Sequence, residues 1–171
     1  MTSRLALKRI AAFMVDWCVL ALFIGLLFLF VSPFVAPLFM QSPFMAEAAG
    51  FCLLTLPLFL YFSLTEALIG GSLGKKFLRL RVSTVKAQQM RYRTSALRTG
   101  IKLVPWELAH FAIWNVFIFS ASPAYGLGVG ALGLSYGLII IYATSLFLKR
   151  GRTPYDLIAQ TIVSEDKNKY I

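Results

Sequence analysis

The stretch Arg9-Ile10-Ala11-Ala12-Phe13-Met14-Val15-Asp16 places one charged residue at the start of a long apolar segment and a second one inside it. Seven residues are about two turns of an α-helix, so Arg9 and Asp16 share one helix face. A helix rises ~1.5 Å per residue, so Asp16 is expected roughly 10 Å beyond Arg9 along the axis. A carboxylate at that depth in lipid is energetically costly, so we expect Asp16 to have a specific role.

The composition of the chain indicates an integral membrane protein. Of its 171 residues, 58% are hydrophobic and 14% are charged, whereas soluble domains average ~45–50% and ~25%. The net charge of +10 would suggest nucleic acid as the partner of a soluble protein. Because the basic residues flank the apolar runs and avoid them, we expect the lipid bilayer as the partner, and no nucleic acid.

Four apolar stretches are each long enough to cross a bilayer as a helix. They cover residues 10–35, 45–68, 100–120 and 125–148. The proline-rich end of the first stretch predicts a short outer loop within residues 32–43, and Gly70-Gly71 predicts the end of the second. The expected fold class is an all-α membrane protein with four transmembrane helices, in which residues 1–171 form a single domain.

The positive charges predict how these helices are oriented. All 17 Lys and Arg residues lie in the N-terminus, in the central segment up to Lys102, or in the tail, residues 149–171. The positive-inside rule therefore predicts that both termini and the central loop, residues 69–99, are cytoplasmic. We expect a multi-pass protein of the inner (cytoplasmic) cell membrane, with anionic lipid as a partner at its cytoplasmic face.

The central loop contains a strand-like pattern. In FLRLRVST, residues 77–84, apolar residues alternate with arginine and serine, as in a half-buried strand. MRYRTS, residues 90–95, is expected to return as its partner, and QTIVSE, residues 160–165, is a third β-like stretch. The sequence thus predicts a small cytoplasmic β element between the second and third helices. The alternative is an amphipathic loop that associates with lipid.

Ionisable residues also occur within the apolar stretches, toward their cytoplasmic ends: Asp16, Glu66, Glu107 and His110. Counted from Lys102, Glu107 is expected roughly 7 Å deep and His110 roughly 12 Å deep, which brackets the depth of Asp16. Three helices could therefore present these groups in one layer of the inner leaflet. Glu47, at the outer boundary, is expected to be solvated.

Two interpretations of this layer remain open. Ionisable residues inside a membrane are candidates for binding a proton or a cation, because buried carboxylates hold protons near neutral pH. The same residues can instead be structural. Asp16 would then neutralise Arg9 or a loop arginine, and Glu66 and Glu107 would neutralise the lysines at positions 75, 76 and 102.

The sequence contains no catalytic or metal-binding motif. Glu107 and His110 have the i, i+3 spacing of dinuclear metal bundles, but such a site needs the motif twice and the chain has one histidine. Neither a nucleophile elbow nor an HExxH pattern occurs. We expect no metal site, no cofactor and no enzymatic activity.

Two further motifs predict local structure. Thr153, Pro154 and Asp156 have the order of an N-cap, an N1 proline and an N3 acid, which predicts a short capped helix. The pairs Gly126/Gly130 and Gly133/Gly137 fit G-x-x-x-G, which allows close helix packing. We favour packing within the helix bundle over the alternative, a homo-oligomer.

Taken in order, these residues resemble the RDD family of membrane proteins, which is named for one arginine and two aspartates. The pair Arg9 and Asp16 matches the arginine that opens the first transmembrane helix and the aspartate within it. The middle motif matches in its glycines and basic residues: Gly70, Gly74, Lys75 and Arg81. Asp156, followed by Thr161-Ile162-Val163, matches the end.

The resemblance, from about residue 4 to residue 164, implies a protein that takes part in transport, since some members are described as sodium/proton antiporters. The family resemblance does not extend to Glu107 and His110. The leading hypothesis is a small transporter, and in it Asp16 would bind the ion or proton, Glu66, Glu107 and His110 would assist, and Arg9 and Asp156 would set the charge at a cytoplasmic gate. The other hypothesis is a non-transporting scaffold or accessory subunit that binds a partner protein or anionic lipid through residues 75–102. A water-accessible cavity lined by Asp16 and Glu107 favours transport, whereas an ion-paired cluster favours the scaffold.

Overall fold

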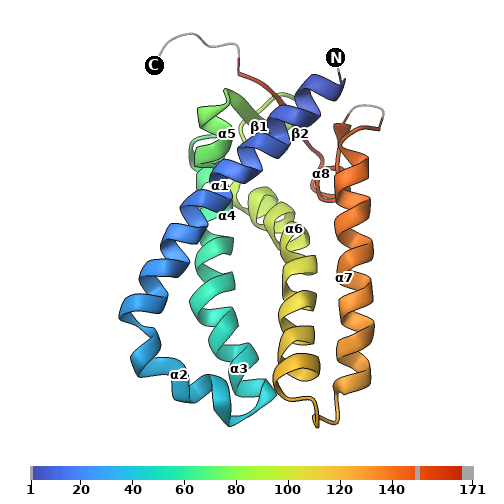
Figure 1. The fold of residues 1–171 in the computed structure, drawn as a ribbon. Coiled ribbons are helices and arrows are strands. Elements are labelled where there is room, and N and C mark those ends of the chain that lie inside the picture. Colours follow the sequence, from blue (N-terminus) through green and yellow to red (C-terminus); the bar gives the residue numbers. More distant parts are fainter. Residues whose placement is uncertain (1, 149–150, 167–171) are drawn as a thin grey trace. The chain divides into compact units, whose positions relative to one another are not determined.

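The computed structural model describes residues 2–148 and 151–166, which are mostly helical (Figure 1). The chain divides into two compact units. The first, which we call the charged unit, comprises residues 2–20, 59–102, 141–148 and 151–166. The second, the apolar unit, comprises Ala21–Leu58 and Leu103–Ile140.

In the described part of the chain, three helices are long and apolar enough to cross a membrane: Ser3–Phe30, Pro43–Leu68 and Tyr125–Ser145. The first lies in α1 (Thr2–Phe30) and the third is α7 (Tyr125–Ser145). The second joins three elements without a break: α3 (Pro43–Gly50), the π-helical turn η1 (Phe51–Thr55) and α4 (Leu56–Leu68). They correspond to the predicted first, second and fourth stretches.

The predicted third stretch, residues 100–120, is helical but is not among these three. It is covered by α6 (Tyr92–Ala112) and the π-helical turn η2 (Ile113–Ile118). Polar side chains lower its hydropathy, among them Lys102 and Glu107. By length and composition alone the structure therefore supports three membrane-spanning helices.

The segment predicted to be a short outer loop, residues 32–43, is mostly helical, and Pro37 does not end a helix. Residues 32–41 form a helix, α2 (Ser32–Gln41), with Pro37 inside it. Pro33 is tolerated because the first turn of a helix has no intrahelical bond for its missing N–H to break. Ser42 then starts α3, and its hydroxyl accepts a hydrogen bond from the Met45 N–H at 3.2 Å.

The predicted strand in the central loop is present, but with a different partner. β1 (Leu80–Thr84) pairs antiparallel with β2 (Thr161–Glu165) of the tail, and Val82 lies opposite Val163. Residues 90–95 are not a strand, because α6 begins at Tyr92. The helical spacing of the polar residues in α6, which places them on one face toward α4, is a stronger signal than the short strand-like alternation of residues 90–95.

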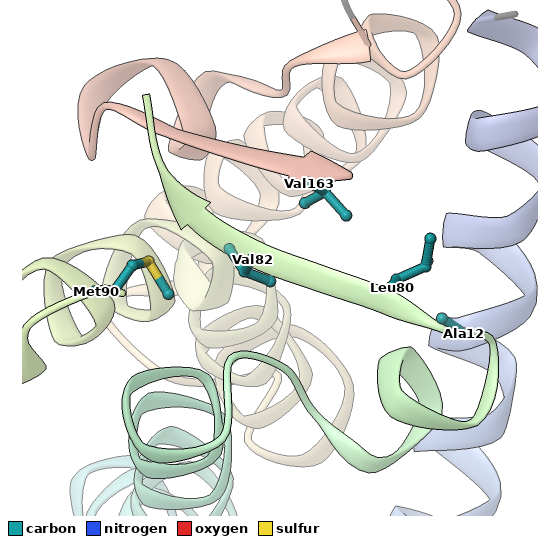
Figure 2. Close-up of a cluster of buried hydrophobic side chains, with 5 residues drawn as sticks. All are labelled: Ala12, Leu80, Val82, Met90 and Val163. Atoms are coloured by element: carbon teal, nitrogen blue, oxygen red, sulfur yellow. The ribbon is translucent and has the colours of Figure 1, made fainter. Parts of the chain in front are cut away.

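A small apolar core holds the sheet to α1 (Figure 2). Leu80 and Val82 point to the same face of β1, where they meet Val163 of β2, Ala12 of α1 and Met90. Each of the five side chains is at most 7% exposed. The N-terminal helix, the central loop and the tail thus share one core.

The glycines of α7 do not pack as predicted. A side chain at Gly126, Gly130, Gly133 or Gly137 would meet no described atom within 4 Å. Instead, α7 makes its close approach at Gly128, where a Cβ atom would come within 2.7 Å of Val116 Cγ2. Packing of the two G-x-x-x-G pairs within the bundle is therefore wrong, and their role in a homo-oligomer stays a prediction.

Candidate functional site

Asp16 caps a short helix that lies far from it in the sequence. The helix is α5 (Leu73–Phe77), and Ser72 is its N-cap. Asp16 Oδ2 accepts a hydrogen bond from the Ser72 hydroxyl at 2.6 Å, and Oδ1 accepts one from the Gly74 N–H at 2.8 Å. A carboxylate at this position satisfies N–H groups that a helix start leaves without partners.

Tyr61 of α4 completes the cap. Its hydroxyl donates to Asp16 Oδ1 at 3.0 Å and accepts from the Leu73 N–H at 3.0 Å. Asp16 is 4% exposed, so its two oxygens receive three donors in a buried setting. The cost of burying this carboxylate is offset by these bonds.

The glycine at position 74 is required by the close contact between α5 and α1. A Cβ atom there would overlap the backbone carbonyl of Ala12 and approach Asp16 Cγ to 3.0 Å. The obstacle is backbone, which cannot rotate away as the end of a side chain can. This contact explains why position 74 of the middle motif, which contains Gly70, Gly74, Lys75 and Arg81, is a glycine.

We predict that Gly74→Ala lowers the free energy of unfolding by about 1–3 kcal/mol, because overpacking pushes α5 from α1 and loosens the Asp16 cap. Gly126→Ala is the matched control, since a methyl group there meets no described atom and improves helix propensity. Equilibrium unfolding in mixed micelles, followed by tryptophan fluorescence, measures both. Equal stability of the two variants would refute the contact.

Asp156 lies at the start of α8 (Pro154–Ile158) and joins the tail to α1. Its Oδ2 accepts hydrogen bonds from the Thr153 N–H at 3.2 Å and the Thr153 hydroxyl at 2.7 Å, so the predicted capping box is present. The same oxygen pairs with Arg9 Nη2 at 2.6 Å. Arg9 Nη1 also donates to the carbonyl of Gly151.

Arg98 of α6 connects the two halves of the site. Its Nε and Nη2 bond Asp156 Oδ1 at 2.9 and 2.8 Å, and its Nη1 pairs with Glu66 Oε2. The other oxygen of Glu66 pairs with Lys75. The result is a continuous chain of ion pairs that runs from Arg9 through Asp156, Arg98 and Glu66 to Lys75.

The buried charges of the charged unit balance. The five residues of the ion-pair chain and Asp16, which caps α5, are each at most 8% exposed: Arg9, Asp16, Glu66, Lys75, Arg98 and Asp156. They comprise three cations and three carboxylates. Because a buried charge is tolerated only when it is paired, the six residues have to be present together.

The shifted pKa values outside the spans agree with this pairing. Burial alone would raise the pKa of Asp156, but the guanidinium groups of Arg98 and Arg9 outweigh it and hold that pKa well below its usual range. Burial lowers the pKa of Lys75, and the Glu66 carboxylate acts against that shift. Asp156 is therefore ionised throughout the physiological pH range.

Glu107 and His110 lie in the apolar unit with a separate set of partners. Glu107 Oε1 accepts a hydrogen bond from the Thr55 hydroxyl, which in turn accepts one from Trp106 Nε1 at 3.0 Å. His110 Nδ1 is 4.0 Å from Glu107 Oε1. Glu47, expected to be solvated, is half-buried, and its Oε2 has no hydrogen-bond donor among the described residues.

The structure thus divides the predicted site residues between two groups. The charged unit holds Arg9, Asp16, Glu66, Lys75 and Asp156, and the apolar unit holds Glu107 and His110. The predicted pairing of Asp16 with Arg9 is wrong, because each has another partner. Gly70 has φ = 76°, which favours glycine, and the Arg81 side chain lies against it.

Arg98 is the residue that sequence reasoning missed. It is one of nine basic residues in the central segment up to Lys102, and no local pattern separates it from the others. The available signal was helical spacing, since Ser95, Arg98, Thr99 and Lys102 recur at i, i+3, i+4 and i+7. Such a polar stripe on a helix beside apolar neighbours predicts buried partners rather than solvent.

Comparison with known proteins supports one assignment. The model of the RDD family matches residues 4–160, which include every residue of the ion-pair chain. A search of curated proteins and a search of solved structures found no match. Because the family model covers most of the sequence, the chain belongs to the RDD family of membrane proteins.

Proposed function

We propose that this protein is a non-transporting membrane scaffold or accessory subunit and not an enzyme. The observation that supports the proposal is that the carboxylates of the charged unit are already occupied. Glu66 holds two protein cations, Asp156 holds two, and Asp16 receives three donors. An incoming cation would have to displace a buried partner, which costs several kcal/mol.

The topology that we propose has four spans in the inner cell membrane, with both termini in the cytoplasm. Arg9 of the N-terminal helix contacts Asp156 of the tail, so the two ends of the chain lie on the same side. An even number of crossings is then required. In this topology α6 and η2 form the third span in chain order, despite polar residues such as Glu107, which accepts a hydrogen bond from Thr55.

The surface that we propose for partners is the cytoplasmic loop. Exposed basic residues cover it and its continuation into α6: Arg79, Lys86, Arg91 and Arg93. Such a surface attracts an acidic protein segment or the anionic headgroups of the inner leaflet. The ion-pair chain beneath it would hold the loop, the N-terminal helix and the tail in a fixed arrangement for binding.

The second candidate is cation/proton exchange, and the apolar unit is where an observation favours it. The Glu47 carboxylate has a buried oxygen that no described residue bonds, and Glu107 and Glu47 interact electrostatically. Two carboxylates that repel each other tend to share a proton. With His110 beside Glu107, this group has spare capacity to bind a proton, unlike Asp16 and Asp156.

Proton flux in liposomes distinguishes these candidates. The purified protein is reconstituted with a pH-sensitive dye, and inward gradients of Na⁺ or K⁺ are imposed. We predict that the wild type gives no more flux than empty liposomes. Flux that disappears in Glu47→Gln or Glu107→Gln, but survives in Asp16→Asn, would replace the scaffold with the second candidate. Flux that disappears in a folded Asp16→Asn variant would contradict both.

A further inference from the structure

The surface of the charged unit stays apolar beyond the end of α4. In residues 68–77 the exposed side chains are all large and apolar: Leu68, Ile69, Leu73 and Phe77. Leu73 and Phe77 lie four residues apart in α5, on one helix face, and are 49% and 75% exposed. The first exposed charged residue after α4 is Arg79. The surface therefore changes from apolar to charged after α5, not at the end of α4.

The polar backbone that joins α4 to α5 is covered by protein. Residues 70–72 are buried, and the Gly70 carbonyl accepts a hydrogen bond from the Val82 N–H at 2.7 Å. The first N–H groups of α5 are bonded by Asp16 and Tyr61. Within a bilayer, irregular backbone is tolerated only where protein covers it. This connection meets that requirement.

The contact between α5 and α1 gives the depth of α5. Arg9 is the last cation of α1, and every exposed side chain in residues 11–30 is apolar, Cys18 included. Gly74 of α5 lies against the Ala12 carbonyl and bonds Asp16. These two residues of α1 are roughly 5 and 10 Å beyond Arg9 along the helix axis. The helix α5 therefore lies beside the apolar part of α1, beyond its last charged side chain on the N-terminal side.

We propose that α5 is an interfacial helix that lies in the inner leaflet, so that its exposed face contacts phospholipid. Leu73 and Phe77 lie among the acyl chains, and Arg79 lies at the level of the phosphate groups. This assignment deepens the partner surface proposed above and takes its cytoplasmic side from the proposed topology. It commits the start of the central loop to lipid.

The surroundings of this face favour lipid over a protein partner. A surface that binds another protein is typically an apolar patch with a polar rim. The face of α5 instead continues the apolar surface of α4, where Leu64 and Leu68 are 42% and 70% exposed.

The one charged side chain beside this face is directed to a carboxylate. Lys76 Nζ is 3.9 Å from Asp166, which follows β2 in the tail. A lysine at a membrane boundary can lay its methylene chain along apolar surface while its ammonium stays in a polar region. Lys76 is therefore compatible with a helix at the depth of the acyl chains.

Spin labels on α5 test this position in the full-length protein, reconstituted in liposomes of phosphatidylglycerol and phosphatidylcholine. Cys18→Ala and Cys52→Ala first remove the two native cysteines, which are both exposed. Leu73→Cys and Phe77→Cys are then labelled one at a time with a nitroxide. Electron paramagnetic resonance measures how often each label collides with molecular oxygen, which concentrates in hydrocarbon, and with a neutral nickel chelate, which stays in water.

Two labelled positions serve as references. Leu64→Cys reports the lipid-facing surface of α4, and Gln88→Cys reports an exposed position in the loop beyond β1. We expect collisions of the nickel chelate at positions 73 and 77 to be at least about threefold rarer than at position 88. Collisions with oxygen should be about as frequent as at position 64.

The two probes together separate lipid from the other occupants of this face. Frequent nickel collisions at positions 73 and 77, as at position 88, would overturn the proposal, because water would then cover α5. Rare collisions with both probes would also overturn it and would indicate a protein cover, such as a second copy of the chain. If one labelled variant does not fold, the other position decides by the same criteria. None of these outcomes depends on proton flux, so the scaffold proposal stands or fails separately.

Discussion

Replacing Arg98 by methionine is expected to lower the free energy of unfolding by about 3–5 kcal/mol. We expect no substitution of another basic residue to lower it more. Arg98 is 1% exposed and bonds Glu66 and Asp156, both of which are 0% exposed. Its removal leaves three buried carboxylates with two cations. Equilibrium unfolding in mixed micelles measures the loss.

Two variants make this result specific. Arg93→Met lies on the same helix but removes an exposed charge, so its stability should stay within about 0.5 kcal/mol of the wild type. Arg98→Lys keeps the charge, but one ammonium cannot reproduce bonds from Nε, Nη1 and Nη2 to two carboxylates. It should recover only part of the loss. An Arg98→Met variant as stable as Arg93→Met would contradict a stabilising role of the ion pairs that Arg98 forms.

Replacing Asp156 by asparagine is the second change with a large expected effect, again about 3–5 kcal/mol at pH 7, because Arg9 and Arg98 would share no buried anion. The effect should depend on pH. The pKa of Asp156 is lowered in the folded state, so its contribution is complete above its unfolded pKa of about 3.9 and is lost as the pH falls through the folded value.

The measurement is the difference in unfolding free energy between wild type and Asp156→Asn, taken from pH 8 to pH 3. The difference should be constant down to about pH 5 and should narrow below about pH 4. Asp166→Asn is the matched control, since Asp166 forms a partly exposed pair with Lys76 at 3.9 Å. Its effect should stay below about 1 kcal/mol. A constant difference down to pH 3 would contradict the lowered pKa.

Local signals in the sequence predicted much of the fold. Long apolar runs predicted α1, the path from α3 to α4, and α7, because a bilayer imposes both length and composition. Alternation in residues 77–84 predicted β1, and the order of Thr153, Pro154 and Asp156 predicted α8. Each of these signals is contained in a few adjacent residues.

Long-range pairings could not be predicted in the same way. The partner of β1 lies about eighty residues away in the tail, and alternation alone does not choose between β2 and residues 90–95. The sequence also suggested that Asp16 neutralises Arg9, since both share a helix face. In the structure Asp16 instead caps α5, and Arg9 bonds the tail. Choices between equally charged partners depend on the tertiary fold.

The central claim is that Arg9, Asp16 and Asp156 act as buried structural partners rather than as carriers of an ion. A double-mutant cycle on Arg9→Met and Asp156→Asn tests it most directly, because the two residues form an ion pair at 2.6 Å although 147 positions separate them in the sequence. The measured quantity is the coupling in unfolding free energy. We predict a coupling of about 2 kcal/mol, with the double variant less destabilised than the sum of the single variants. Effects that add within about 0.5 kcal/mol would contradict it.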